Sequence, residues 1–313
     1  MGARHSESRN WRLLLTGASG YLGAHLAPRA AKLFDVYSTY FSNPERITAG
    51  VPLYLDLSNP DAVRQMLYFF QPEAIVHTAA SNRDGQNMAA IVPVARALAE
   101  YAREAGIRLI HLSTDLVFDG DNPPYHDDSP LSPIMSYGAQ KAEAETLVRE
   151  IYPAATIVRP SLIYGLDPLD AQTRWLVEGM RGGETVSLFT DEYRCPIWVD
   201  ALVDALIELI DVDCPGPIHL VGPQSLNRWD FGLKLLAALN VPRSPNVIPA
   251  TVAESGLVRS KNLTLTAERA EQLLKTHLPG VDEVLLPRTT SPLVELPLPD
   301  QEHRTRKPRY CEG

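Results

Sequence analysis

The chain has 313 residues, of which 45% are hydrophobic and 21% are charged. A chain of this size and composition can bury a large core, either in two domains or in one large α/β unit. Its net charge of −9 at pH 7 argues against a surface for nucleic acid or for anionic membranes. We therefore expect neither a nucleic-acid partner nor a membrane partner.

The three cysteines, Cys195, Cys214 and Cys311, are far apart in the sequence and form no Cys-x-x-Cys pair. Neither a disulfide framework nor a zinc site is indicated, so we expect no bound metal and a reducing, cytoplasmic location. No apolar run reaches the roughly 18 residues that a membrane-spanning helix requires. Residues 1–10 are polar and lack the apolar segment of an export signal, and we expect them to be a disordered leader.

The most informative segment is a glycine-rich turn near the start of the chain. The apolar run Leu13–Leu15 predicts a strand that leads into glycines with the spacing Gly-x-x-Gly-x-x-Gly, and a helix is predicted to follow. In such a turn the first glycine allows a sharp bend, the second admits a pyrophosphate, and the third lets the helix pack closely. The N–H groups and the dipole at the start of the helix attract phosphates. We therefore predict a dinucleotide-binding site at Gly17, Ser19, Gly20, Tyr21, Leu22 and Gly23.

Predicted strands and helices alternate through residues 11–165. In the first helix, Leu22, Leu26 and Leu33 are expected to share one face. Ser58 or Asn59 is expected to cap the second helix. The alternation predicts a parallel, doubly wound α/β sheet of the Rossmann type, which makes residues 11–165 a dinucleotide-binding domain. Strands are expected at 36–41, 52–55, 74–76, 108–113 and 156–158, and helices at 21–33, 59–70, 88–105 and 137–150.

Beyond residue 165 the alternation becomes irregular. Helices are predicted at 172–180, 199–210, 228–239 and 267–274, and proline-rich loops join them. We interpret residues 166–285 as a smaller C-terminal substrate lobe that is interleaved with the last strands of the sheet. Residues 286–313 form a proline-rich tail, which is either disordered or wrapped around a partner subunit.

Three chemically informative residues follow the strand expected at 108–113. Thr114 lies at the carboxyl end of this strand, the edge at which open α/β sheets bind ligands. Tyr137 and Lys141 are four residues apart on a predicted helix and therefore share one face. A lysine ammonium beside a phenol lowers the pKa of the tyrosine, so that the phenol exchanges a proton near neutral pH. We therefore predict that these three residues interconvert a carbonyl and an alcohol.

Further motifs accompany the glycine turn and these three residues. They are Asp56-Leu57, His77-Thr78-Ala79-Ala80, Arg159-Pro160-Ser161-Leu162-Ile163-Tyr164-Gly165, Ser113-Thr114-Asp115-x-Val117-Phe118-Asp119-Gly120 and Arg259-x-x-Asn262-x-x-Leu265. Together they resemble the extended short-chain dehydrogenase/reductases and, among these, the dTDP-4-dehydrorhamnose reductases. The regulatory β subunits of methionine adenosyltransferase are similar in the same motifs.

The resemblance implies a reductase that uses NADPH or NADH to reduce a nucleotide-linked 4-keto-6-deoxy sugar. Tyr137 would be the proton donor, Lys141 would hold the nicotinamide ribose, and Thr114 would hydrogen-bond the keto oxygen. The family also implies a homodimer.

The resemblance assigns further residues to the cofactor. Ala79 and Ala80 would line it, and Asp56 and Leu57 would border the adenine. From its position before a helix, Asp56 is equally expected as a capping or turn carboxylate. His77 is expected to be a packed or cofactor-lining histidine and not a base.

The end of the second strand bears on the choice of cofactor. The segment 39–43 has no acid to bind the 2′-OH of an adenosine ribose, so a strict preference for NAD is not supported. Ser42, Asn43 or Arg46 would tolerate a 2′-phosphate. We therefore expect NADP or NAD, with a preference for NADP or for dual use.

The substrate side departs from the family pattern. Asn82, Leu162, Arg194 and Arg259 are the candidates for substrate contact. Asn82 belongs to a segment that is shorter than in the rhamnose enzymes, and Leu162 stands where those enzymes carry a tryptophan. Arg194 is of the residue type that pairs with a pyrophosphate, although a surface arginine fits equally well.

Two other functions stay open. The chain is alternatively a cofactor-binding regulatory subunit, similar to the methionine adenosyltransferase partner, with little turnover of its own. It is also alternatively a sugar-nucleotide epimerase or dehydratase. The dehydratases place Asp-Glu after the threonine, whereas here Asp115-Leu116 follows, and this disfavours dehydration.

Overall fold

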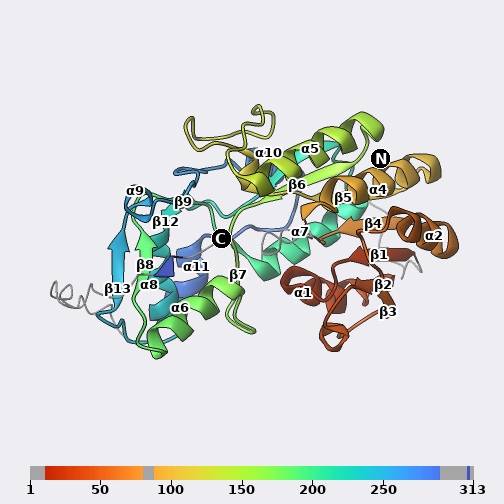
Figure 1. Ribbon diagram of the computed structural model, residues 1–313. Coiled ribbons are helices and arrows are strands. Elements are labelled where there is room, and N and C mark those ends of the chain that lie inside the picture. The colour runs from red at the N-terminus through yellow and green to blue at the C-terminus, as the bar shows by residue number, and fades with distance from the viewer. Residues whose placement is uncertain (1–10, 80–87, 290–308, 311–313) are drawn as a thin grey trace.

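The computed structural model describes residues 11–79, 88–289 and 309–310. Within them, seven parallel strands form a central sheet in the order β11-β6-β5-β4-β1-β2-β3 (Figure 1). The chain adds β2 and β3 on one side of β1 and then crosses to add β4 on the other side. The crevice between β1 and β4 is therefore the topological switch point at which such sheets bind ligands. The strands are β1 (Arg12–Thr16), β2 (Asp35–Tyr40), β3 (Val51–Tyr54), β4 (Ala74–His77), β5 (Arg108–Leu112), β6 (Thr156–Pro160) and β11 (Gly216–Leu220).

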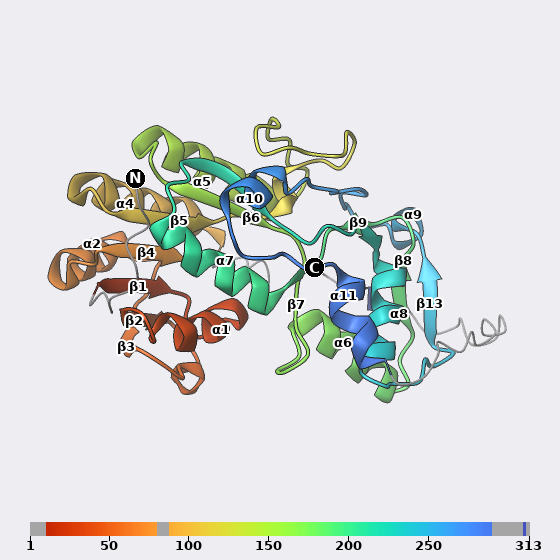
Figure 2. The ribbon, with the colours of Figure 1, turned by 180° about the vertical axis from the view of Figure 1, so that it is seen from behind.

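Helices cover both faces of this sheet. The helices α1 (Tyr21–Ala30) and α7 (Val199–Asp211) cover one face, and they lie side by side in Figure 2. The other face packs against α2 (Pro60–Phe70), α4 (Ile91–Ala105) and α5 (Ser136–Ile151). Successive strand residues supply the two cores in turn, since Leu13 and Leu15 pack with α1 and α7 whereas Leu14 faces the other layer. The predicted doubly wound α/β fold is confirmed.

The first helix is shorter than predicted. Pro28 lies inside α1, and the helix ends at Ala30. Leu33 therefore falls beyond the helix and is 43% exposed, whereas Leu22 and Leu26 are buried, so the prediction that the three share one helix face was wrong for Leu33. A periodic pattern of leucines continues past the end of a helix without marking where the hydrogen bonds stop.

The cap of α2 is Asn59 and not Ser58. The Asn59 side chain accepts hydrogen bonds from the backbone N–H groups of Asp61 and Ala62. Ser58 instead donates its hydroxyl to Asp56. Among the other predicted helices, α4 begins three residues later than expected, at Ile91, and ends where predicted before a left-handed Gly106.

A smaller lobe lies beside the sheet, on the left in Figure 1. The chain enters it after β6 and returns through α7 and β11 to the central sheet before it continues the lobe, so the two parts are interleaved. None of the helices in the described ranges is long and apolar enough to cross a membrane. The remaining helices are α6 (Ala171–Arg181), α8 (Arg228–Ala238), α9 (Val252–Ser255), α10 (Glu268–Leu273) and α11 (Val281–Leu285), with short 3₁₀ turns η1 (Pro44–Arg46), η2 (Asp115–Val117) and η3 (Leu286–Arg288). The remaining strands are β7 (Ile163–Tyr164), β8 (Val186–Phe189), β9 (Tyr193–Arg194), β10 (Ile197–Trp198), β12 (Leu226–Asn227), β13 (Val247–Ala250) and β14 (Arg309–Tyr310).

The end of the chain adds a strand to this lobe. β14 pairs in parallel with β8, which gives the order β13-β8-β14. The Tyr310 ring stacks on Phe189 at 5.5 Å between centroids and 3° between planes. The described end of the predicted tail thus folds onto its own lobe, and the expectation that this end is disordered or wraps a partner was wrong for residues 309–310. The rest of the tail from residue 290 and the predicted leader, residues 1–10, lie outside the described residues.

Candidate active site

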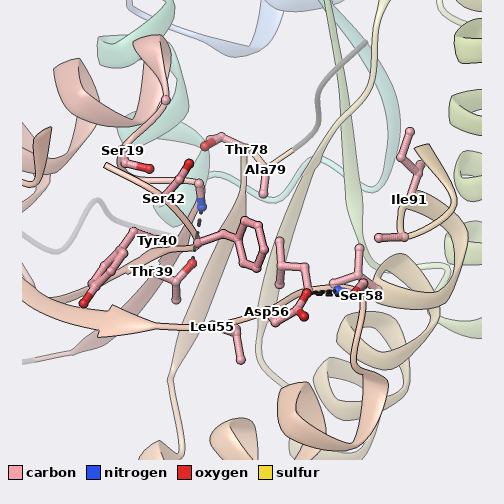
Figure 3. Close-up of a pocket in the computed structure, with 16 residues that line it drawn as sticks. Ser19, Thr39, Tyr40, Ser42, Leu55, Asp56, Ser58, Thr78, Ala79 and Ile91 are labelled. Atoms are coloured by element: carbon pink, nitrogen blue, oxygen red, sulfur yellow. Dashed lines mark hydrogen bonds between the residues drawn. The ribbon is translucent and has the colours of Figure 1, made fainter. Parts of the chain in front are cut away.

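A pocket of about 220 Å³ lies at the carboxyl ends of β1, β2, β3 and β4, where the start of α4 also contributes to its wall. Figure 3 shows the hydroxyls of Ser19 and Ser42 toward one end of it, and Asp56 with Ser58 toward the other. Its position matches the switch point of the sheet, so it is the natural ligand site of this fold. The lining residues are Gly17, Ser19, Gly20, Thr39, Tyr40, Phe41, Ser42, Leu55, Asp56, Leu57, Ser58, Thr78, Ala79, Ala90, Ile91 and Val94.

The glycine turn leaves bare backbone facing this pocket. Gly17 has a φ of +72°, and a Cβ at this position would lie 2.7 Å from the Cα of Ala79, across the crevice between β1 and β4. Gly20 is the residue before α1 and brings no side chain to cap it. The first N–H groups of a helix lack partners within the helix and, with its dipole, bind anions. The residues present therefore fit the phosphates of a dinucleotide.

The predicted cofactor residues fall into two groups. Gly17, Ser19, Gly20, Asp56, Leu57 and Ala79 line the pocket. Tyr21, Leu22 and Gly23 of the turn do not line it, and neither do Tyr137 and Lys141, which were also predicted to bind the cofactor.

The Tyr21 hydroxyl donates to the carbonyl oxygen of Pro168, 3.3 Å away, and Leu22 is 7% exposed in the core beneath α1. Gly23 packs against the backbone of the turn itself, because a Cβ there would lie 2.3 Å from the Gly17 carbonyl oxygen. The predicted contacts of Tyr21, Leu22 and Gly23 with a cofactor therefore have no counterpart in the pocket. Ala80 lies outside the described residues.

Asp56 is both a turn carboxylate and a residue of the pocket lining, the two alternatives that the sequence left open. Its carboxylate accepts hydrogen bonds from the Ser58 N–H at 2.9 Å and from the Ser58 hydroxyl at 2.6 Å, which makes it a turn carboxylate. It also lines the pocket. Phe41 and Ser42, which follow β2, also line the pocket. In the sequence they were indicated only by the rule that ligands bind at the carboxyl ends of parallel strands. Among the described lining residues there is no lysine or arginine.

Lys141 is buried beneath the end of β5. It is 1% exposed, and its Nζ donates to the carbonyl oxygen of Leu112, the last residue of that strand. Burial lowers the pKa of Lys141 to about 8, although the nearby Glu145 carboxylate raises it. Glu145 in turn is bound by the buried Arg159, with Nη2 and Oε2 2.7 Å apart. The lysine is thus held at one point of the sheet edge, next to the residues that follow β5.

Tyr137 reaches the same edge because α5 approaches η2 very closely. A Cβ at Gly138 would lie 2.1 Å from the Leu116 carbonyl oxygen, so only glycine permits this contact. Tyr137 is half-buried, and burial followed by the Asp115 carboxylate raises its pKa to about 12. The predicted lowering of this pKa by Lys141 was therefore wrong for this arrangement, in which burial and the Asp115 carboxylate are the causes of the shift and the Lys141 ammonium donates to the Leu112 carbonyl instead. The phenol is held in its protonated form.

Thr114 and Asp115 follow β5 after one intervening residue, Ser113, and are both buried. The Thr114 Oγ1 donates to Asp115 Oδ1 at 3.3 Å and accepts the Leu116 N–H, also at 3.3 Å. Asp115 Oδ2 accepts the Ser161 hydroxyl at 2.7 Å. The strand end, α5 and the segment after β6 therefore meet around one carboxylate, which the sequence pattern did not single out.

Beside Asp115 lies a buried charged cluster, formed by Glu192, Arg194, Arg228 and Arg259. Arg194 spans the two acids, with Nε 3.5 Å from Asp115 and Nη2 3.3 Å from Glu192. Arg259 forms a bidentate pair with Glu192, and Arg228 Nε lies 3.8 Å from it. Burial raises the pKa of Glu192, but the guanidinium groups of Arg194, Arg259 and Arg228 lower it further, to about 2.

This cluster changes the interpretation of the predicted substrate residues. Arg194 is 3% exposed and also donates to the Ser260 carbonyl, so it is not a surface arginine. The predicted substrate contacts of Arg194 and Arg259 find no support here, because Glu192 already binds both guanidinium groups. Leu162 packs against the apolar core of the lobe with Phe231 and Tyr164. Asn82 lies outside the described residues.

His77 is packed, as expected. It is 1% exposed, its Nδ1 lies 2.6 Å from the Thr16 hydroxyl, and burial followed by the charge of Lys141 lowers its pKa to about 3. A neutral, enclosed imidazole of this kind supports the sheet edge and is not a base near neutral pH. In the described ranges, no group of three or more His, Cys, Asp and Glu residues is arranged to hold a metal ion.

Comparison with known proteins gives consistent matches along the chain. A family model described as the RmlD substrate binding domain matches residues 11–286. A dTDP-4-keto-6-deoxy-D-glucose reductase of Streptomyces niveus is 33% identical over 265 residues, which cover 81% of this chain and 88% of that protein. A methionine adenosyltransferase 2 subunit beta of Danio rerio is 31% identical over 284 residues, 84% of each protein.

Solved structures agree with these matches. The dTDP-4-dehydrorhamnose reductase from Bacillus anthracis, solved in complex with NADP, superposes with a TM-score of 0.74 at 26% identity, over 88% of this chain and 97% of that one. Both resemblances drawn from the motifs are thereby confirmed. The chain belongs to the family of the RmlD substrate binding domain.

Proposed function

We propose that this chain is an NAD(P)H-dependent reductase of a nucleotide-linked 4-keto-6-deoxy sugar. One observation carries the proposal: Lys141 binds the end of β5, Thr114 follows that strand, and Tyr137 lies near the Asp115 that Thr114 contacts, at the carboxyl edge of the sheet where the glycine-lined pocket also lies. A bound nicotinamide would supply a hydride to the carbonyl carbon of the sugar. The relatives named as reductases of such sugars support the substrate class.

The residues of the chain would then have distinct tasks. Tyr137, whose pKa of about 12 keeps it protonated, would donate the proton that the carbonyl oxygen needs. Lys141 would hold the ribose next to the nicotinamide, since its ammonium is fixed at the end of β5. The bare backbone at Gly17 and Gly20 would bind the pyrophosphate.

The cofactor, the location and the assembly belong to the same proposal. NADP or NAD is the expected cofactor, and the solved relative with NADP supports the former. A cytoplasmic location is supported by Cys195 and Cys214, which are buried free thiols. We also expect a homodimer, which sedimentation of the purified protein would test.

A regulatory role is the second candidate. Five relatives that cover 84% of this chain are methionine adenosyltransferase 2 β subunits, at 28–31% identity. In that role the pocket would bind a cofactor without turnover. A dehydratase is disfavoured, because Leu116 stands where the dehydratases have an acid.

The test is oxidation of NADPH and NADH with a panel of 4-keto sugar nucleotides, before and after the substitution Tyr137→Phe. Loss of a general acid lowers the rate by about 10²- to 10⁴-fold, whereas binding of the cofactor should persist. Tyr152→Phe is the matched control, because the Tyr152 hydroxyl donates to the Ile107 carbonyl at the far end of α5. Cofactor binding without turnover on any of the sugars would reject the reductase and favour the regulatory subunit.

A further inference from the structure

Asp115 is a buried carboxylate at the centre of the proposed site that has no task in the reduction described above. Each of its oxygens has a different neighbour. Oδ1 faces the Thr114 hydroxyl at 3.3 Å, whereas Oδ2 accepts the Ser161 hydroxyl at 2.7 Å and lies 3.5 Å from Arg194 Nε. The Ser161 hydroxyl itself accepts the N–H of Cys195 at 3.2 Å, so its hydrogen stays directed at Asp115. A proton therefore binds more readily to Oδ1 than to Oδ2, which already accepts the Ser161 hydroxyl and lies next to the Arg194 guanidinium group.

The hydrogen bonds of Thr114 leave it unable to serve a ketone in this arrangement. A threonine hydroxyl has one hydrogen and two lone pairs. The hydrogen is directed to Asp115, and one lone pair accepts the Leu116 N–H. What remains for a substrate is a lone pair. A keto oxygen only accepts hydrogen bonds, so it cannot pair with that lone pair, whereas the alcohol product can donate to it.

A proton on Asp115 Oδ1 reverses this polarity. The protonated carboxyl donates to the Thr114 Oγ1, which frees the threonine hydrogen to turn toward the keto oxygen. The bond from Ser161 to Oδ2 is unaffected. The same proton removes the negative charge that raises the pKa of Tyr137, so the phenol becomes a stronger acid. Both changes favour reduction of the carbonyl.

We propose that Asp115 is a positioning residue of the reduction, whose carboxyl group decides whether the Thr114 hydroxyl presents its hydrogen or its lone pair to the substrate. The inference rests on the proposed function, and it adds a pH dependence to it. Reduction should be fast while Asp115 is protonated, and it should slow as the pH rises and the carboxyl ionises.

The charges around Asp115 set the pH at which this change occurs. Burial raises the pKa of Asp115; Arg194 on β9 and the hydrogen bonds from Ser161 and Thr114 lower it, and Glu192 raises it. Tyr137 on α5 and Cys195 after β9 also face the carboxylate, and its charge raises the pKa of both. Arg194 shares its charge between Asp115 and Glu192, so it compensates only part of the burial. The carboxyl therefore holds its proton to a higher pH than an exposed aspartate.

The first test is the pH profile of kcat for the reduction, over about pH 5 to 9, with Asp115→Asn. The asparagine keeps the shape of the side chain, accepts from Ser161 and donates to Thr114, as the protonated acid does. In the wild type, kcat should fall by about tenfold per pH unit above the pKa of Asp115. This falling limb of the pH profile should be absent in Asp115→Asn. KM should change less than kcat, because the affected hydrogen bond forms to the reacting oxygen.

Ser161→Ala is the second variant and separates Asp115 from Lys141, which also titrates. Removing the Ser161 hydroxyl takes away a bond to the ionised carboxylate, so the limb should move to higher pH. A limb that belongs to Lys141 would stay in place. Carbon-13 NMR of labelled aspartate supplies a readout without turnover. The carboxyl resonance that Ser161→Ala shifts, and that Asp115→Asn removes, should titrate above the ordinary range of aspartate.

The outcomes separate this inference from the proposed function. If the wild type reduces a keto sugar and Asp115→Asn keeps the wild-type pH profile, the inference fails and the reductase stands. An Asp115 resonance that titrates in the ordinary range overturns the inference as well. If the wild type reduces none of the sugars, the proposed function fails and the inference fails with it.

Discussion

The cofactor pocket and the buried charged cluster use polar groups in opposite ways. The pocket is lined by backbone, hydroxyls and apolar side chains, and Asp56 is the single charged residue of its described lining. In the cluster, the guanidinium groups of Arg194, Arg228 and Arg259 surround Glu192, and all four side chains are at most 8% exposed. The polar groups of the pocket are accessible to a ligand, whereas the charged groups of the cluster bind one another.

This difference separates binding from stability. Affinity at the pocket depends on shape, because an added methyl group meets backbone there at less than 3 Å. Stability at the cluster depends on charge, because removing one partner of a buried pair leaves the others uncompensated. A substitution in the pocket should therefore act mainly on cofactor binding, and a substitution in the cluster mainly on unfolding.

The largest effect is expected for Gly17→Ala. The new Cβ would lie 2.7 Å from the Ala79 Cα, and the φ of +72° disfavours an L side chain by about 1–2 kcal/mol. We expect NADPH binding, measured by nicotinamide fluorescence, to weaken by about 100-fold or more, since the backbone must shift where a phosphate binds.

Gly106→Ala is the matched control for this prediction. Gly106 has a φ of +63° at the end of α4, but no atom lies within 4 Å of a Cβ built there. Gly106→Ala should lose about 1–2 kcal/mol of stability in urea through its φ alone and keep the cofactor, whereas Gly17→Ala should lose more stability, because of the added clash, and should also lose the cofactor. Equal affinity for NADPH in the two variants would show that the close approach to Ala79 is not what shapes the pocket.

Glu192→Gln tests the cluster. The pKa of Glu192 is lowered from 4.5 to about 2, so its ionised form stabilises the fold by about 3 kcal/mol above pH 5. Because the folded pKa is the lower one, this contribution is lost as the pH falls from about 4.5 toward 2. Glu192→Gln should therefore be less stable than the wild type by about 3 kcal/mol at pH 7, and the difference should shrink toward pH 2.

The measurement is the free energy of unfolding in urea as a function of pH. Glu150→Gln, at an exposed position in α5, serves as the control and should change stability by less than about 0.5 kcal/mol. A constant difference between Glu192→Gln and the wild type at every pH would mean that the arginines do not depend on the charge of Glu192.

The same contrast explains what the sequence predicted and what it did not. The glycine turn is a local pattern, and Gly17, Ser19 and Gly20 line the pocket as predicted. Tyr21 and Leu22 were assigned with them by proximity in the sequence, but successive helical residues are rotated by about 100° and point elsewhere. Local pattern thus located the site without deciding which side chains face it.

The charged cluster has no local pattern at all. Arg259 and Glu192 are 67 residues apart, and Arg194 reaches the Ser260 carbonyl 66 residues away. Arg194 was a candidate for an anionic substrate because of its residue type, and Arg259 was a candidate as part of a motif that carries the family resemblance. Their partner Glu192 was not recognised, because only the folded lobe brings the acid between them.

The smallest expected effect concerns the choice between NADPH and NADH, and it tests the neutrality of the pocket. Ser42 lines the pocket after β2, the place from which such sheets contact the adenosine ribose, and no described lining residue is a lysine or arginine. Ser42→Arg would add a charged donor for the 2′-phosphate, worth about 1–3 kcal/mol, and should favour NADPH over NADH by roughly tenfold in Kd.

The neutral Ser42→Gln should leave the ratio of the two Kd values unchanged. The gain of Ser42→Arg should shrink at high salt, because screening weakens exposed charge pairs. If both cofactors gain equally, the arginine acts on the shared pyrophosphate, and the end of β2 does not select between them.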